Sequence, residues 1–201
     1  MQLEIKHQET YSRGNAILKA LFGYFYILVP HYFVIFFFSI WSLIVHFVAF
    51  FAILINGKYP RNFFDFNIGL FRWILRVDTA YLGLYDSYPP FGVETRTEEV
   101  VFEVKYPEEW DKVQVVLIFL LGIFMVIPHL FILIFMSIAA SLLSWIAWFP
   151  VAFTGNFPKD LHEFIVKFYR WNYRVALYIS FMYPKYPPFN GLREEEQVLV
   201  S

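Results

Sequence analysis

Residues 57–77, GKYPRNFFDFNIGLFRWILRV, recur in similar form 98 positions later as residues 155–175, GNFPKDLHEFIVKFYRWNYRV. The same spacing relates Pro30-His31 to Pro128-His129 and Tyr88-Pro89-Pro90-Phe91 to Tyr186-Pro187-Pro188-Phe189. Nearer the start of the chain the spacing becomes 99, as in the match of Gly23 to Gly122. So many identities at fixed spacing indicate a tandem duplication, with a one-residue change between Gly23 and Pro30.

The duplication divides the chain into two units. They cover residues 1–92 and 101–189, with a polar linker, 93–100, between them and a polar tail, 190–201, at the end. Each unit contains, in order, a short alternating stretch, two apolar segments and an amphipathic segment. We therefore expect the same structure to form twice.

Composition is typical of a membrane protein. Of the 201 residues, 59% are hydrophobic, 23% aromatic and only 16% charged, and the mean hydropathy is +0.51. Soluble domains contain about 45–50% apolar and about 25% charged residues. The net charge of −1 does not indicate a nucleic-acid partner, and the absence of cysteine excludes disulfides and thiolate metal sites. We predict an all-α integral membrane protein with minor β-elements.

The alternating stretches, residues 3–7 and 102–106, have the period of a β-strand. Residues 93–99 are polar and β-prone, and could pair with the second of these stretches as a small hairpin. These are the minor β-elements that we expect.

The apolar segments come in pairs, 16–29 with 32–55 and 114–127 with 130–153. A helix of 24 residues is about 36 Å long, enough to cross a hydrocarbon core of about 30 Å. Proline between the two segments of a pair breaks a helix. We therefore predict a helical hairpin in each unit, which enters and leaves by the same face of the membrane.

The segments that begin near Pro60 and Pro158 are amphipathic. Such a helix can lie in the membrane interface. If it crossed instead, each central arginine would cost about 2.5–3.5 kcal/mol. The interfacial arrangement is favoured, and four crossings are the alternative. In either case both units have the same orientation, because they share one charge pattern.

The polar stripe of each amphipathic helix contains an Arg-Trp-x-x-Arg motif: Arg72, Trp73 and Arg76 in the first, and Arg170, Trp171 and Arg174 in the second. Arginine binds phosphate bidentately and tryptophan favours the interface, so the motif is suited to lipid headgroups or a partner protein. The alternative is internal pairing of the arginines with Asp65, Asp78 and Glu163. Both interpretations stay open.

The Pro-His pairs and the Tyr-Pro-Pro-Phe segments also have two interpretations. His31 and His129 could ligate haem or a metal. The structural interpretation, which we favour, is that each imidazole binds backbone carbonyls freed by the preceding proline. The Tyr-Pro-Pro-Phe segments, residues 88–91 and 186–189, are expected to end a helix and turn the chain, with docking of a partner as the lesser alternative.

Several of these stretches resemble a known family. Gly57-Lys58-Tyr59-Pro60-Arg61, Arg72-Trp73, Arg76-Val77, Tyr88-Pro89-Pro90-Phe91 and Val104-Lys105-Tyr106-Pro107-Glu108 are similar to a bacterial membrane family catalogued as domain of unknown function 4389. The second copy departs from the pattern at Phe157-Pro158-Lys159 and at Glu163. The resemblance implies a prokaryotic membrane protein with no assigned activity.

No nucleophile, metal motif or glycine-rich phosphate loop accompanies these motifs, so we predict no catalytic site, no metal and no cofactor. We expect a non-catalytic accessory or scaffold subunit whose amphipathic helices meet lipid headgroups, a larger complex or a second copy. Its basic residues would face the cytoplasm from a bacterial inner membrane. The alternatives are a small transporter or channel with a pathway between the repeats, lined by Arg72 and Arg170, and an electron-transfer subunit using His31 and His129.

Overall fold

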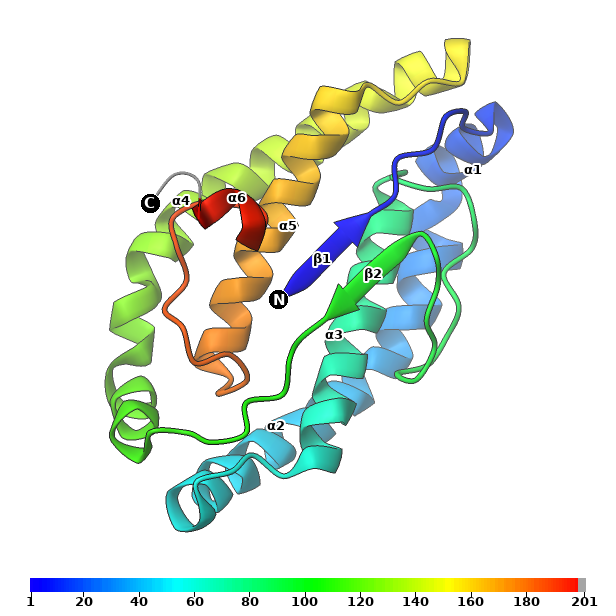
Figure 1. Ribbon diagram of the computed structural model, residues 1–201. Coiled ribbons are helices and arrows are strands. Elements are labelled where there is room, and N and C mark those ends of the chain that lie inside the picture. The colour runs from blue at the N-terminus through cyan, green and yellow to red at the C-terminus, as the bar shows by residue number, and fades with distance from the viewer. Residues whose placement is uncertain (199–201) are drawn as a thin grey trace.

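The computed structural model describes residues 1–198 (Figure 1). Strands β1 (Gln2–Ile5) and β2 (Val100–Glu103) form a small antiparallel sheet. The helices are α1 (Arg13–Gly23), the π-helix η1 (Tyr24–Leu28), α2 (Val29–Asn56), α3 (Arg61–Tyr81), α4 (Lys112–Thr154), α5 (Lys159–Ile179) and the short α6 (Glu194–Val198). The expectation of a mostly helical chain with minor β-elements is confirmed.

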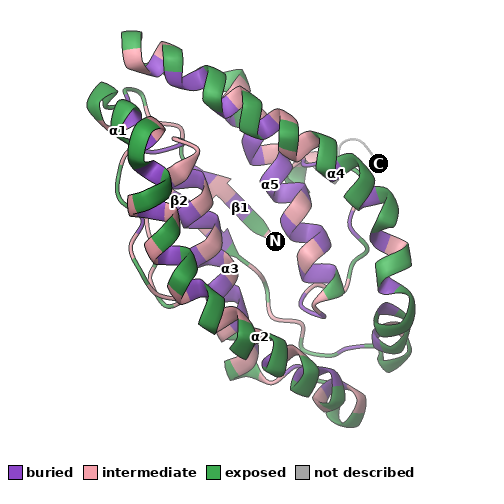
Figure 2. Cartoon of the chain, turned by 180° about the vertical axis from the view of Figure 1, so that it is seen from behind, coloured by how far each residue is buried: buried purple, intermediate pink, exposed green. Residues whose placement is uncertain are grey.

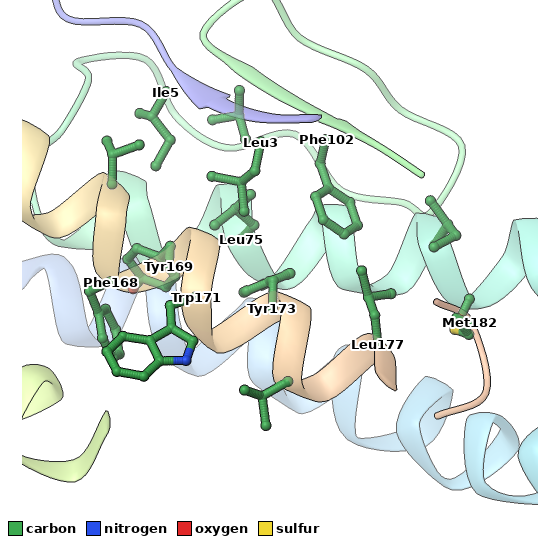
Figure 3. Packing of buried hydrophobic residues seen from close by; sticks show 14 of the residues in the cluster. Leu3, Ile5, Leu75, Phe102, Phe168, Tyr169, Trp171, Tyr173, Leu177 and Met182 are labelled. Carbon is green, nitrogen blue, oxygen red and sulfur yellow. The ribbon is translucent and has the colours of Figure 1, made fainter. Parts of the chain in front are cut away.

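The elements form three layers. The sheet lies on one face, α3 and α5 form the middle, and the long helices α1–α2 and α4 lie on the opposite face (Figures 1 and 2). Figure 3 shows Leu3 and Phe102 of the strands directed toward Leu75 of α3 and Tyr173 of α5. The core is therefore built around the two amphipathic helices, which the layers on either side cover.

The predicted helical hairpins are wrong. Residues 13–56 form one continuous helical rod through η1, and α4 runs without interruption through Pro128. In the first unit the rod contains one residue more than in the second between the positions equivalent to Gly23 and Pro30. The π-helix at Tyr24–Leu28 accommodates this extra residue, because its wider turn adds a residue while keeping the faces on either side aligned.

The ends of the long helices follow from local sequence. Ser12 and Asp111 occupy the N-cap positions, and their side chains accept hydrogen bonds from the amides of Asn15 and Val113. Both rods end at a glycine in the left-handed region, Gly57 at φ 71° and Gly155 at φ 76°.

A pseudo-twofold axis relates the two units. The amide of Tyr11, before the first rod, donates to the carbonyl of Gly155 after the second (2.8 Å), and the equivalent bond joins Trp110 to Gly57 (2.9 Å). The rods are therefore antiparallel. In the sheet, Leu3 pairs with its own equivalent Phe102, so the axis passes through the middle of the sheet.

The strands are exchanged between the units. Arg72 of α3 donates from Nε to the carbonyl of Phe102 in β2 (3.1 Å), and Arg170 of α5 donates to the carbonyl of Leu3 in β1 (3.1 Å). Each helix thus binds the other unit's strand. The predicted hairpin between residues 93–99 and 102–106 does not form, because β2 pairs with β1 instead.

The outward faces of the rods are apolar and exposed. Figure 2 shows exposed residues along α1, α2 and α4. They include Phe25 (69% exposed), Leu43 (71%) and Phe47 (63%) on the first rod, and Ile123 (69%) and Phe149 (66%) on the second. By length and composition, residues 13–56 and 112–154 can each cross a membrane.

The π-helix predicts an asymmetric response to deletion. Removing Phe25 should convert η1 to α-helix, as in α4, and cost no more than about 1 kcal/mol, a fall in melting temperature of about 3 °C. Removing its counterpart Phe124 from α4 rotates the flanking turns by about 100° relative to each other and should prevent folding. Thermal unfolding of the detergent-solubilised chain measures both. Equal damage from the two deletions would contradict this account of η1.

Candidate functional site

A histidine of each rod lies in a pocket built from three motifs. In the first unit His31 of α2 has no exposed surface. Trp73 of α3 donates from Nε1 to its Nδ1 (2.9 Å), and Phe91 stacks on the imidazole with ring centroids 3.7 Å apart. Tyr88 also contacts the imidazole, with a centroid separation of 5.4 Å. The Pro-His, Arg-Trp and Tyr-Pro-Pro-Phe motifs therefore form one site.

The second unit repeats this pocket. Trp171 donates to Nδ1 of His129 (2.9 Å), Phe189 stacks on the ring at 3.9 Å, and Tyr186 lies 3.0 Å from Nε2. Indole nitrogen only donates, so Nδ1 is the acceptor and Nε2 carries the proton. The bonds then run from Trp171 to His129 to the Tyr186 hydroxyl, which donates to the carbonyl of Met125 (2.8 Å).

The hydroxyls of Tyr88 and Tyr186 bind backbone carbonyls of the rods about one turn before each proline. Proline lacks the amide that would bond a carbonyl one turn earlier. Tyr88 donates to the carbonyl of Tyr26 (3.1 Å), which is four residues before Pro30 and would otherwise bond its amide. Tyr186 donates to the carbonyl of Met125 (2.8 Å), which lies one residue after the carbonyl that Pro128 leaves without an amide. We predicted that imidazole would bind these carbonyls. Instead the imidazoles accept from indole, and phenol hydroxyls bind a freed carbonyl in the first unit and the neighbouring carbonyl in the second.

The segments that carry these tyrosines are extended. Pro89, Pro90, Pro187 and Pro188 have no helical or strand structure, and each segment returns from the end of α3 or α5 to its rod. Because the two histidines lie in separate pockets, one in each unit, they do not face each other as a pair of axial ligands would. Among residues 1–198, no group of three or more His, Asp or Glu side chains is placed to hold a metal ion.

The second arginine of each Arg-Trp-x-x-Arg motif is internal. Arg76 is 0% exposed and donates to the carbonyls of Thr95, Gly92 (2.7 Å) and Pro90 (3.4 Å). Burial lowers the pKa of Arg76 to about 10, so the guanidinium stays charged at neutral pH. In the second unit the equivalent loop surrounds Arg174 in the same way, through the carbonyls of Asn190 and Leu192.

All six motif side chains are more than nine-tenths buried: Arg72 8%, Trp73 1%, Arg76 0%, Arg170 5%, Trp171 5% and Arg174 1% exposed. The prediction that they are displayed to lipid headgroups is therefore wrong, because the sheet and the loops cover α3 and α5. Arg72 and Arg170 border different surface pockets, so they do not line one pathway between the repeats.

The predicted carboxylate partners are also wrong. Asp65 pairs with Arg61 (2.9 Å), Glu163 with Lys167 (2.8 Å), and Asp78 accepts from the Tyr32 hydroxyl (2.6 Å). The motif arginines donate instead to backbone carbonyls of the loops and strands. Carbonyls are present at every residue, so no sequence pattern marks them as partners of arginine.

Glycines that sequence reasoning missed let these loops approach the helices. A Cβ at Gly69 of α3 would lie 2.4 Å from the carbonyl oxygen of Val93. In the second unit the glycine is on the other side of the contact: Gly191 of the loop packs against the backbone of Lys167. Position-by-position comparison of the two units reveals this reciprocal pattern, since 69 corresponds to 167 and 93 to 191.

Trp73→Phe tests the histidine pocket. The substitution keeps an aromatic ring but leaves Nδ1 of His31 buried without a donor, so we expect a loss of about 1–3 kcal/mol in the free energy of unfolding. Chemical unfolding in detergent measures it. The control is Trp41→Phe, at a half-exposed position on the rod that carries His31, with an expected change within about 0.5 kcal/mol. Similar losses in both variants would count against the pocket.

Arg76→Lys tests the internal role of the arginines. A lysine keeps the charge but cannot reach three carbonyls in a planar fork, so we expect a loss of about 2–4 kcal/mol. Arg61→Lys, at an exposed ion pair, should change stability by less than about 0.5 kcal/mol. Weaker binding to anionic vesicles with unchanged stability would instead support a headgroup role for Arg76.

Comparison with known proteins agrees with the duplicated architecture. The family model described as Domain of unknown function (DUF4389) matches the chain twice, over residues 19–92 and 117–190. No curated protein and no solved structure matches the chain. Each match includes one complete set of the motifs that build a histidine pocket, which confirms both the resemblance and the tandem duplication. The chain belongs to the DUF4389 family and contains two copies of its domain.

Proposed function

We propose that the chain is a non-catalytic integral membrane protein that serves as an accessory or scaffold subunit. The observation that carries the proposal is the contrast between its two faces. One face consists of two long rods with exposed apolar side chains, whose exposed positions Figure 2 shows, and the opposite face bears the sheet and the charged loops.

The exposure of the rods supports a lipid environment. In the most apolar 18-residue stretch of each rod only 28% of the residues are buried, whereas the core helix of a soluble protein has most of its residues covered. Soluble monomers rarely expose contiguous apolar patches beyond about 300–600 Å². A row of Phe, Leu and Ile along both rods therefore favours contact with acyl chains.

The symmetry of the fold supports an arrangement in the plane of the membrane. Both units carry charges of the same sign at several equivalent positions, such as Arg61 and Lys159 or Asp65 and Glu163, so we infer that both face the membrane in the same way. A twofold axis preserves that relation when it is parallel to the membrane normal. The rods are antiparallel and hence perpendicular to the axis. A rod of 44 residues is also about 66 Å long, twice the thickness of the hydrocarbon core.

The sheet side then faces the aqueous phase. Its exposed side chains include Lys6 and Lys105, which occupy equivalent positions in the two units. Beside β1, a surface pocket of about 1030 Å³ is lined by acidic and basic residues from β1, the linker and α5. This charged surface, on the cytoplasmic side, is where we place the partner protein, because the buried arginines and tryptophans are already used in holding the layers together.

Spin labels test the orientation of the rods. The chain has no cysteine, so single substitutions Phe22→Cys, Phe36→Cys and Phe51→Cys place one label each along the exposed face of the first rod. Rods in the membrane plane should give three similar depths in vesicles. A crossing helix would place position 36 about 20 Å from the other two along its axis, with those two near opposite surfaces.

A fourth site tests the scaffold role. A photo-crosslinker at Lys105→Cys should react with one protein partner in native membranes, whereas the same reagent at Phe36→Cys should react with lipid. In the spin-label experiment, three unequal label depths would contradict the arrangement of the rods in the membrane plane. Absence of any protein adduct from position 105 would contradict the accessory role.

A further inference from the structure

A pocket with a largely apolar wall and several polar side chains lies between the two units, among all four large helices. Its volume is about 450 Å³, and the polar residues of its lining are Tyr32 of α2, Asp78 and Tyr81 of α3, Ser137 and Ser141 of α4, and Tyr169 and Asn172 of α5. Tyr32 and Ser141 are exposed on the rods, so the pocket opens on the rod side of the molecule. None of these residues belongs to the motifs shared by the two copies.

The pocket breaks the pseudo-twofold symmetry. At the equivalent place across the axis, six of the seven polar residues are replaced by apolar ones: Leu130 for Tyr32, Ala176 for Asp78, Ile179 for Tyr81, Leu43 for Ser141, Phe71 for Tyr169 and Ile74 for Asn172. Packing of the two units does not require these polar residues, since apolar residues fill the equivalent positions on the other side of the axis. Polar groups gathered in one copy of a duplicated place mark it as a site with a ligand of its own.

Asp78 has the only charged side chain among the residues that line this pocket. Its carboxylate accepts one hydrogen bond, from Tyr32 (2.6 Å), and no Lys, Arg or His within residues 1–198 makes an ion pair with it. Burial raises the pKa of Asp78 to about 6, which leaves it mostly ionised at neutral pH. Carboxylates in such surroundings are ordinarily paired with a cation.

We propose that this pocket binds the ammonium group of a small organic cation or of an aminolipid headgroup. The carboxylate supplies the counter-charge, and Phe168 and Tyr169 supply aromatic rings of the kind that attract ammonium. The hydroxyls of Ser137 and Ser141 donate to backbone carbonyls of their own helix (2.7 and 2.9 Å), so their free lone pairs can accept from an ammonium N–H.

The size of the pocket favours an organic cation over a bare ion. A volume of about 450 Å³ falls within the range of small-molecule sites, which is about 300–1,000 Å³. The proposal goes beyond the scaffold role and does not depend on how the rods lie in the membrane, so it can be tested on solubilised protein.

The test uses the full chain in a maltoside detergent, titrated calorimetrically with tetramethylammonium, with ethanolamine and with a short-chain phosphatidylethanolamine. A phosphatidylglycerol of equal chain length is the control ligand. We expect ammonium compounds to bind, and Asp78→Asn to weaken them by at least about tenfold. Asp78→Glu should restore much of the affinity. Asp65→Asn, which removes an exposed carboxylate of α3, should have no effect.

Comparison of the ligands identifies the source of the cation. Tighter binding of the aminolipid than of free ethanolamine indicates a membrane lipid, and equal binding indicates a soluble amine. The carboxamide of Asp78→Asn still accepts from Tyr32, so this variant should fold, as its thermal unfolding will show. Failure of all three ammonium probes to bind at roughly 10 mM, or equal binding by wild type and Asp78→Asn, would overturn the proposal.

Discussion

Two equivalent hydrogen bonds hold the layers of this protein in register: Arg72 to the carbonyl of Phe102 and Arg170 to that of Leu3. Each of these bonds joins one unit to the other, so the strand that covers the middle helix of a unit comes from the other unit. The sheet is only four residues long in each strand and would not be stable alone. Its position above α3 and α5 depends on these arginines, and the burial of both helices depends in turn on the sheet.

Burying charged guanidinium groups costs free energy, and in this fold hydrogen bonds to backbone carbonyls offset that cost. Arg76 and Arg174 each organise the loop that follows their helix, and this loop brings Tyr88 or Tyr186 to a proline of the rod. In each unit, therefore, one arrangement of neighbouring groups contains a buried guanidinium, an indole, an imidazole and a phenol. The motifs that stand apart in the sequence are parts of this single arrangement.

The sequence was sufficient for the duplication, the apolar helical segments and the amphipathic helices, because identities at fixed spacing and helical periodicity are local signals. It singled out the motifs that build the histidine pockets, but did not show that they come together in one site. The sequence led us to predict hairpins, and did not reveal that each rod continues through its proline. Proline predicts a break, but Tyr88 satisfies the carbonyl of Tyr26 from 62 positions away, and such compensation has no local signature. Strand exchange was equally hidden, since the alternating pattern of residues 102–106 fits either neighbour. Backbone carbonyls as arginine partners leave no trace in side-chain identities.

Strand exchange has a consequence for the origin of this architecture. A single unit would present α3 without a covering strand and a strand without a helix, so a one-domain ancestor would have needed a second copy of itself to fold. In such a homodimer every surface occurs twice, and a substitution that suits one side is imposed on the other. Gene fusion removes that constraint. The fused chain can keep one side for packing while the other side changes alone, and the pair Asp78 and Ala176, at equivalent positions of the two units, is a difference of this kind.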